Sequence, residues 1–372
     1  MIEFQAVTKQ YPDGTVAVDS LDLTVEDGKI TVFVGPSGCG KTTSLRMINR
    51  MIDPTGGSIL LDGKDIRESD PPLLRRGIGY VNQHAGLFPH RTVLDNVATV
   101  PLLTGRGKRD ARKKAAELLE LVGLDPAFGK RYPAQLSGGQ QQRVGVARAL
   151  AADPPVLLMD EPFSAVDPIV RDDLQQQLLR LQSELDKTIV FVTHDIDEAI
   201  KLGDRVAVFR VGGRLAQYDT PSALLAKPAD EFVSSFVGRD RGYRALGFLT
   251  ASGVPVGPLP TVKVGEKVTE TEHGWAVVVD ADDKPLGWIS AESTQDDVVS
   301  GDDLVSGGSL FEVDSSTSGT AGSLRNALDA ALSSPAAVGI AVGKGGAVVG
   351  GVTADTVLAA LADARRSGEV PA

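Results

Sequence analysis

The segment from Gly35 to Thr42 is the clearest chemical feature of this 372-residue chain. It fits the pattern G-x-x-x-x-G-K-[ST], follows an apolar stretch at residues 30–34 and opens a helical pattern at residues 41–51. Glycines there let backbone N–H groups close around phosphate oxygens, and the helix N-terminus adds positive potential. Lys41 would reach the outer phosphates and the Thr42 hydroxyl would bind Mg²⁺. The segment therefore predicts a nucleotide phosphate site.

An apolar stretch at residues 156–159 ends in two carboxylates, Asp160 and Glu161. We expect Asp160 to hold Mg²⁺, directly or through water, and Glu161 to polarise an attacking water as general base. Alone, an ordinary acidic strand end is an equally good explanation. Together with the phosphate loop, the pair favours hydrolysis of the bound nucleotide.

A second helix start with anion-binding character lies at Ser137, which precedes a helical pattern at residues 140–152. Ser137 is a good N-cap residue, and the glycines at 138 and 139 leave backbone N–H groups accessible. One nucleotide has no obvious use for both helix starts. From the residues alone, a second phosphate contact and a purely structural N-cap both remain open.

The elements that must position these groups alternate between strands and helices. Short strands are expected at residues 2–4, 16–18, 21–25 and 30–34, and buried strands at 78–81, 156–159, 189–193 and 206–210. Helices are expected at residues 41–51, 109–122, 140–152 and 169–186. This alternation predicts an α/β fold with a mainly parallel sheet.

The order of the motifs makes a family resemblance specific. With Leu-Ser-Gly-Gly-Gln at 136–140 between the phosphate loop and the acidic strand end, the first 240 residues resemble the ATPase subunit of an ABC transporter. The resemblance implies a P-loop NTPase with an antiparallel β subdomain and a helical subdomain. It also implies a homodimer that holds two ATP molecules between its subunits, each completed by residues 137–140 of the other subunit.

The resemblance assigns further roles. Tyr11 matches the aromatic residue that stacks on adenine, Gln83 matches the glutamine that contacts Mg²⁺, and His194 matches the histidine that senses the γ-phosphate. Asp167 lies in the matching dimer-contact loop, residues 164–167. The nucleotide-binding set is therefore Tyr11, Gly35, Ser37, Gly38, Cys39, Gly40, Lys41, Thr42, Thr43, Ser137, Gly138, Gly139, Gln140 and Asp167. The catalytic set is Glu161, His194 and Gln83, and the metal set is Thr42, Gln83 and Asp160.

Among proteins of this kind, an importer motor and a non-transport ATPase acting on ribosomes or DNA must be compared. A single nucleotide domain without a membrane span or long coiled coil favours the importer subunit. We expect it to need a separate permease and a substrate-binding protein, and to lie at the cytoplasmic face of the membrane. The features from Thr193 to Arg205 and from Phe236 to Arg241 resemble glycine betaine, choline and carnitine importers. The alternative is an importer of an amino acid, taurine or a polyamine.

The last third of the chain contains an internal repeat. Residues 275–280 and 286–292 recur as residues 338–343 and 349–355, at a constant offset of 63 positions. Helical patterns at residues 324–332 and 356–365 flank the second copy, whereas no clear helical pattern precedes the first copy. The osmoprotectant importers carry a tandem CBS pair here, so the resemblance implies a smaller α+β module at 245–365, a degenerate tandem CBS-like regulatory domain, after an ATPase domain at 1–240. A module that only packs the dimer is the alternative.

The charge and the cysteine content limit which partners and which cellular compartment fit this chain. The net charge is −11, of which −8 lies in residues 241–372, so the basic stripe of a nucleic-acid-binding protein is missing. Cys39 is the only cysteine, which excludes an internal disulfide and favours a reducing compartment. We interpret it as a small apolar residue rather than a nucleophile. The first residues show no secretory-signal pattern.

Overall fold

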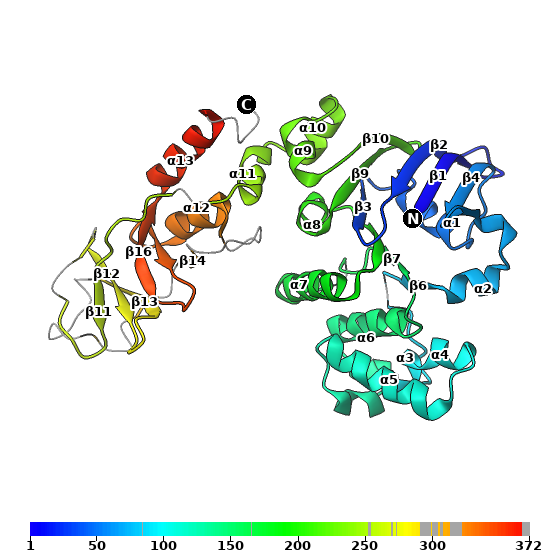
Figure 1. Ribbon diagram of the computed structural model, residues 1–372, viewed down its shortest axis with the longest axis horizontal. Coiled ribbons are helices and arrows are strands. Elements are labelled where there is room, and N and C mark those ends of the chain that lie inside the picture. The colour runs from blue at the N-terminus through cyan, green and yellow to red at the C-terminus, as the bar shows by residue number, and fades with distance from the viewer. Residues whose placement is uncertain are drawn as a thin grey trace. The chain divides into compact units, whose positions relative to one another are not determined.

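The structure is a computed structural model, and its contacts divide the chain into two units, Met1–Val237 and Gly238–Ala372. Figure 1 shows strands and helices in both units. The residues that the structure describes are 1–83, 85–164, 166–251, 254–268, 271–272, 274–290, 299, 304–305, 308–312 and 322–366.

A six-stranded sheet lies at the centre of the first unit. Its strands are β3 (Ile30–Val34), β6 (Ile78–Val81), β7 (Val156–Asp160), β8 (Thr188–Val192), β9 (Arg205–Arg210) and β10 (Arg214–Asp219), in the order β10-β9-β3-β8-β7-β6. Only β9 and β10 pair antiparallel, so the predicted, mainly parallel sheet is confirmed. The sequence places five of the strands within one residue of their ends. It misses β10, which has no fully buried residue and hence no apolar run.

A second sheet in this unit is antiparallel. It contains β1 (Ile2–Gln10), β2 (Val16–Val25), β4 (Gly56–Leu61) and β5 (Lys64–Asp65), in the order β2-β1-β4-β5. The expectation of separate strands at 16–18 and 21–25 is wrong, because one strand covers both. Ala6 and Ser20 each take a left-handed φ of 47°, and register shifts interrupt the pairing of β1 and β2. Such bulges break the regular alternation from which strand limits are predicted.

Helices lie around the central sheet and beyond its edge (Figure 1). The predicted helix at 41–51 ends early, at Ile48, and Arg50 then takes a left-handed φ of 55°. Helices α3, α5 and α6 pack against one another in a helical cluster. The helices of the unit are α1 (Lys41–Ile48), α2 (Pro71–Arg76), α3 (Val93–Val97), α4 (Thr99–Leu103), α5 (Lys108–Leu121), α6 (Gly138–Leu150), α7 (Pro168–Leu185), α8 (Ile196–Leu202), α9 (Pro221–Ala226) and α10 (Glu231–Val237), with 3₁₀ turns at Ile66–Glu68, Pro126–Lys130 and Pro133–Gln135.

The described residues of the second unit form two three-stranded sheets. One has the order β11-β12-β13 and the other β14-β15-β16, and in each the first pair is parallel and the second antiparallel. Its elements are α11 (Arg241–Ala245), a 3₁₀ turn at Leu246–Phe248, β11 (Thr261–Lys263), β12 (Trp275–Val279), β13 (Pro285–Ser290), β14 (Phe311–Glu312), α12 (Leu324–Ser333), β15 (Val338–Val342), β16 (Val348–Thr353) and α13 (Ala354–Arg366).

The internal repeat read from the sequence is visible in the strand register. Trp275 pairs with Ser290 in the first hairpin, and Val338 pairs with Thr353 in the second, again 63 positions apart. The two hairpin turns also meet, because the Val348 N–H donates a 2.9 Å hydrogen bond to the carbonyl of Asp283. The repeated hairpins therefore form a paired structure. Residues 291 and 292, the last two of the first copy, lie outside the described residues.

Candidate functional site

The phosphate loop joins β3 to α1, and its glycines are required by the backbone. Gly40 takes a φ of 91° at the position before α1, and a Cβ there would overlap the carbonyl oxygen of Ala17. Cys39 is fully buried, and burial raises the pKa of its thiol against the opposing effect of Lys41. A buried, protonated thiol agrees with its interpretation as a small apolar residue.

Lys41 begins α1 and points back into the loop. Its ammonium group donates hydrogen bonds to the carbonyl oxygens of Gly35 at 2.7 Å and Pro36 at 3.0 Å, and the residue is only 5% exposed. A buried ammonium needs such partners. The loop therefore holds its cation where incoming phosphate oxygens could replace the two carbonyl groups.

Asp160, at the end of β7, lies beside the start of α1. Its Oδ1 accepts a 2.8 Å hydrogen bond from Thr42 Oγ1, and its Oδ2 lies 3.2 Å from both the guanidinium of Arg46 and the hydroxyl of Tyr80. Hydroxyl and carboxylate oxygens are the ligands that Mg²⁺ prefers, so the pair fits this ion. Sequence reasoning missed Arg46 and Tyr80. The four-residue spacing from Thr42 to Arg46, which places both on one helix face, was a usable signal.

Glu161 follows β7 in an unusual conformation. Its φ is 46°, and its N–H donates a 3.0 Å hydrogen bond to the carbonyl of Val192, at the end of β8. Glu161 Oε2 then lies 3.2 Å from His194 Nδ1 and 3.5 Å from Gln83 Nε2. Gln83 Nε2 also donates to Ser164 Oγ at 3.2 Å. The structure thus brings together all three residues of the predicted catalytic set, from the ends of three neighbouring strands.

The helix start at residue 137 is a well-formed cap. Ser137 Oγ accepts a 3.3 Å hydrogen bond from the Gln140 N–H, and Gln140 Oε1 accepts one of 3.0 Å from the Ser137 N–H. Ser137 is exposed and Gln140 is half-buried, and among the described residues each side chain bonds to the other's backbone rather than to the phosphate loop. Ser137 is therefore confirmed as the N-cap of α6. Gly138 and Gly139 form the first turn of that helix.

The remaining predicted residues lie at the periphery. Tyr11, in the turn between β1 and β2, is half-buried, with the Lys9 ammonium 5.4 Å from its ring centroid. Thr43 is half-buried on α1. Asp167 is exposed immediately before α7, in a loop whose Ala165 lies outside the described residues. None of these positions contradicts its predicted role.

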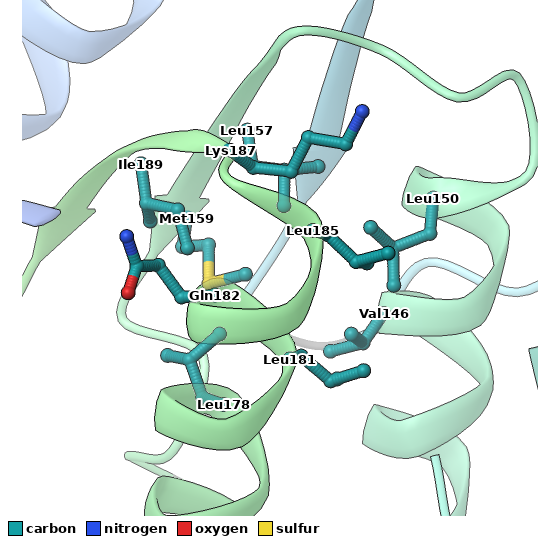
Figure 2. A pocket seen from close by; sticks show the side chains of 10 residues that line it. All are labelled: Val146, Leu150, Leu157, Met159, Leu178, Leu181, Gln182, Leu185, Lys187 and Ile189. Carbon is teal, nitrogen blue, oxygen red and sulfur yellow. The ribbon is translucent and has the colours of Figure 1, made fainter. Parts of the chain in front are cut away.

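An apolar hollow between α6 and α7 is a different feature (Figure 2). Aliphatic side chains and Met159 line it, and its two polar residues are engaged outside it. Lys187 Nζ pairs with Asp153 at 2.8 Å, and Gln182 Nε2 donates to the Gly28 carbonyl at 2.6 Å. The hollow thus has no group for a phosphate and is a packing gap between the helical cluster and α7.

Comparisons with known proteins agree with this geometry. The ABC transporter family model matches residues 18–164. The osmoprotectant import ATP-binding protein OsmV of Salmonella typhimurium is 49% identical over 302 residues, covering 78% of this chain and 79% of that protein. The glycine betaine/carnitine/choline transport ATP-binding protein OpuCA of Bacillus subtilis is 53% identical over 241 residues, 65% of this chain and 63% of that protein.

Among solved structures, a dimeric ATP-binding cassette in a post-hydrolysis state, bound to ADP and Pi, is similar with a TM-score of 0.55. It is 35% identical, and the match covers 59% of this chain and 99% of that one.

The phosphate loop at the end of β3, with carboxylates at the end of β7, two strands away in the same sheet, defines a P-loop nucleotide-hydrolysing protein. The chain belongs to the ATP-binding proteins of ABC transporters, the family that hydrolyses ATP to power transport. The family expected from the motif order is therefore confirmed. Among the described residues, no helix is long and apolar enough to span a membrane.

Proposed function

We propose that this chain is the motor subunit of an importer for quaternary-amine osmoprotectants such as glycine betaine, choline and carnitine. One observation supports this class of solute over the others. The 49% identity to an osmoprotectant import ATP-binding protein extends over 302 residues, more than the 237 residues of the nucleotide-binding unit. The similarity therefore includes part of the second unit, which a motor for another solute would have no reason to share.

In the proposed site, the phosphate loop and Lys41 bind the phosphates of ATP and Tyr11 stacks on adenine. Thr42, Asp160 and Gln83 would hold Mg²⁺, and the ion would neutralise charge on the phosphates. Glu161 removes the proton of the attacking water, and His194 contacts the γ-phosphate. The convergence of Glu161, His194 and Gln83 supports these roles.

Two copies of the chain complete each site in this proposal. Residues 137–140 of one copy contact the γ-phosphate bound by the other, and Asp167 lies at the dimer contact. Ser137 and Gly138 are exposed at the start of α6, which supports this contact, whereas Gly139 is buried. The motor further requires an integral membrane permease, which holds it at the cytoplasmic face of the membrane, and an extracytoplasmic substrate-binding protein.

We propose that the second unit is a degenerate tandem CBS-like module. Its second half runs β14-α12-β15-β16-α13, and its first half repeats the hairpin in the same register. The module would regulate transport, and a role confined to packing the dimer is the alternative.

Uptake by the complex assembled with its permease and binding protein in lipid vesicles tests the solute. Vesicles carry ATP inside, and radiolabelled glycine betaine, choline, carnitine, methionine, taurine and a polyamine are offered separately. Uptake of one or more quaternary amines alone is expected. Uptake of methionine, taurine or a polyamine without any quaternary amine would overturn the proposal of solute and leave the ATPase assignment intact.

A further inference from the structure

A buried carboxylate lies directly behind the loop that carries His194. Glu198, on α8, is only 7% exposed. Its Oε2 accepts a 2.6 Å hydrogen bond from Thr193 Oγ1, and its Oε1 accepts one of 3.2 Å from Gln175 Nε2 on α7. A buried carboxylate is costly unless it is bonded in this way. Glu198 therefore connects two segments that border the proposed site.

Thr193 links Glu198 to His194, because it bonds to Glu198 and directly precedes His194 in the chain. The Thr193 hydroxyl donates to Glu198 and also accepts a 3.0 Å hydrogen bond from the Asp195 N–H. The Thr193 N–H donates a 3.1 Å hydrogen bond to the carbonyl of Phe33, on the strand that leads into the phosphate loop. The Thr193 hydroxyl, which is bonded to Glu198, therefore holds the backbone after His194, and the Phe33 carbonyl holds the backbone before it.

The hydrogen bond between Glu198 and Gln175 connects Glu198 to α7, and α7 contacts the proposed dimer-contact loop. Arg171, on α7, donates a 3.2 Å hydrogen bond from Nη2 to the carbonyl of Val166 in that loop. Its buried Nε makes no hydrogen bond among the described residues. Arg171, Thr193 and Glu198 line one small hollow together with Glu161, Ser164, His194 and Asp195. Glu198 therefore stands between α7 and the loop that presents His194.

Building on the role proposed for His194, we infer that Glu198 is a positioning residue for that side chain. Through Thr193 it holds the His194 ring at Glu161, and through Gln175 it couples that position to α7, which follows the dimer-contact loop. Glu198 itself touches none of the reacting atoms.

Steady-state ATP turnover and ATP affinity, measured on the full chain, give the first test. In Glu198→Ala and Thr193→Val, turnover should fall about tenfold or more, while the Kd for ATP stays within about twofold, because a displaced catalytic group slows the reaction without removing binding contacts. Glu198→Gln should recover most of the turnover, since its amide oxygen can accept from Thr193. Asp197→Asn, an exposed carboxylate on the same helix, is the matched control.

The NMR signal of the His194 ring gives a second test. It would not change if Glu198 only stabilised the fold. The ring signal in ¹H–¹³C spectra is assigned by its loss in His194→Ala. It should shift in Glu198→Ala and in Thr193→Val, whereas the His90 signal should stay. An unmoved His194 signal, or parallel loss of ATP binding and turnover in both variants, would overturn the inference. If His194→Ala keeps full turnover, the role proposed for His194 itself fails, which is a separate result.

Discussion

Glu161 and His194 lie within hydrogen-bond distance of each other, with 3.2 Å between Oε2 and Nδ1. They come from the ends of adjacent parallel strands, β7 and β8, and the hydrogen bond from the Glu161 N–H to the Val192 carbonyl fixes one strand end against the other. A carboxylate and an imidazole that meet at the edge of a sheet, beside a phosphate loop, form an arrangement suited to activating water next to a phosphate.

Replacing Glu161 by Gln tests the carboxylate alone. The amide keeps the shape of the side chain but cannot accept the proton, so ATP turnover should fall about 10²–10⁴-fold while ATP binding persists. Phosphate release and nucleotide binding measure the two effects. Glu184→Gln, an exposed position on α7, is the control and should behave as wild type. Near-normal turnover in Glu161→Gln would show that another group is the base.

A mixture of two inactive variants tests whether each site is built from two copies. Ser137→Arg places bulk and charge at the exposed start of α6, and Lys41→Ala removes the phosphate-loop cation. In a mixed dimer one site lacks both groups and the other is intact. Mixing should therefore restore part of the ATPase activity that each variant lacks alone. Verified mixed dimers without activity at any ratio would argue against shared sites.

The chemistry of the site could be predicted from the sequence because it lies in short, contiguous motifs next to apolar strands. Glu161, Gln83 and His194 each follow a buried strand, and neighbouring parallel strands bring such positions to one edge. Tyr80 could not be found in this way, since its contact with Asp160 spans 80 positions and depends on strand pairing. The limits of β1 and β2 were also missed, because bulges at Ala6 and Ser20 interrupt the alternation.

The backbone of the phosphate loop gives a prediction about stability. Gly40 and Gly63 both have a left-handed φ, of 91° and 77°, but only at Gly40 would a Cβ meet backbone atoms. Gly63→Ala should cost about 1–2 kcal/mol for the conformation alone. Gly40→Ala should cost about 1–3 kcal/mol more, because the loop must also shift. Denaturant unfolding without nucleotide measures both, and equal losses would contradict the crowding at Gly40.

The pH dependence of stability should report on Glu198. Burial raises its pKa above the ordinary 4.5, with Asp195 acting in the same direction, while Thr193, Arg171 and Gln175 oppose the shift. The folded state therefore binds the proton more tightly than the unfolded state, and this contribution to stability is lost as the pH rises from 4.5 through the raised pKa. The Glu198→Gln variant has no carboxyl group at this position, so its stability lacks this pH-dependent contribution.

The melting temperature of Glu198→Gln relative to wild type should consequently increase with pH over this range. Asp197→Asn should show no such trend relative to wild type. A difference between Glu198→Gln and wild type that is constant with pH would mean that the folded and unfolded pKa values of Glu198 are equal.

ATP-dependent uptake of glycine betaine by the vesicle-embedded complex tests the central claim most directly. The wild-type motor and Glu161→Gln are compared in otherwise identical complexes, with equal ATP binding verified in both. The wild-type complex should accumulate glycine betaine inside the vesicles only when ATP is present on the side of the motor, and the Glu161→Gln complex should not. Accumulation without ATP, or equal accumulation by both complexes, would contradict the conclusion that hydrolysis at this site powers import.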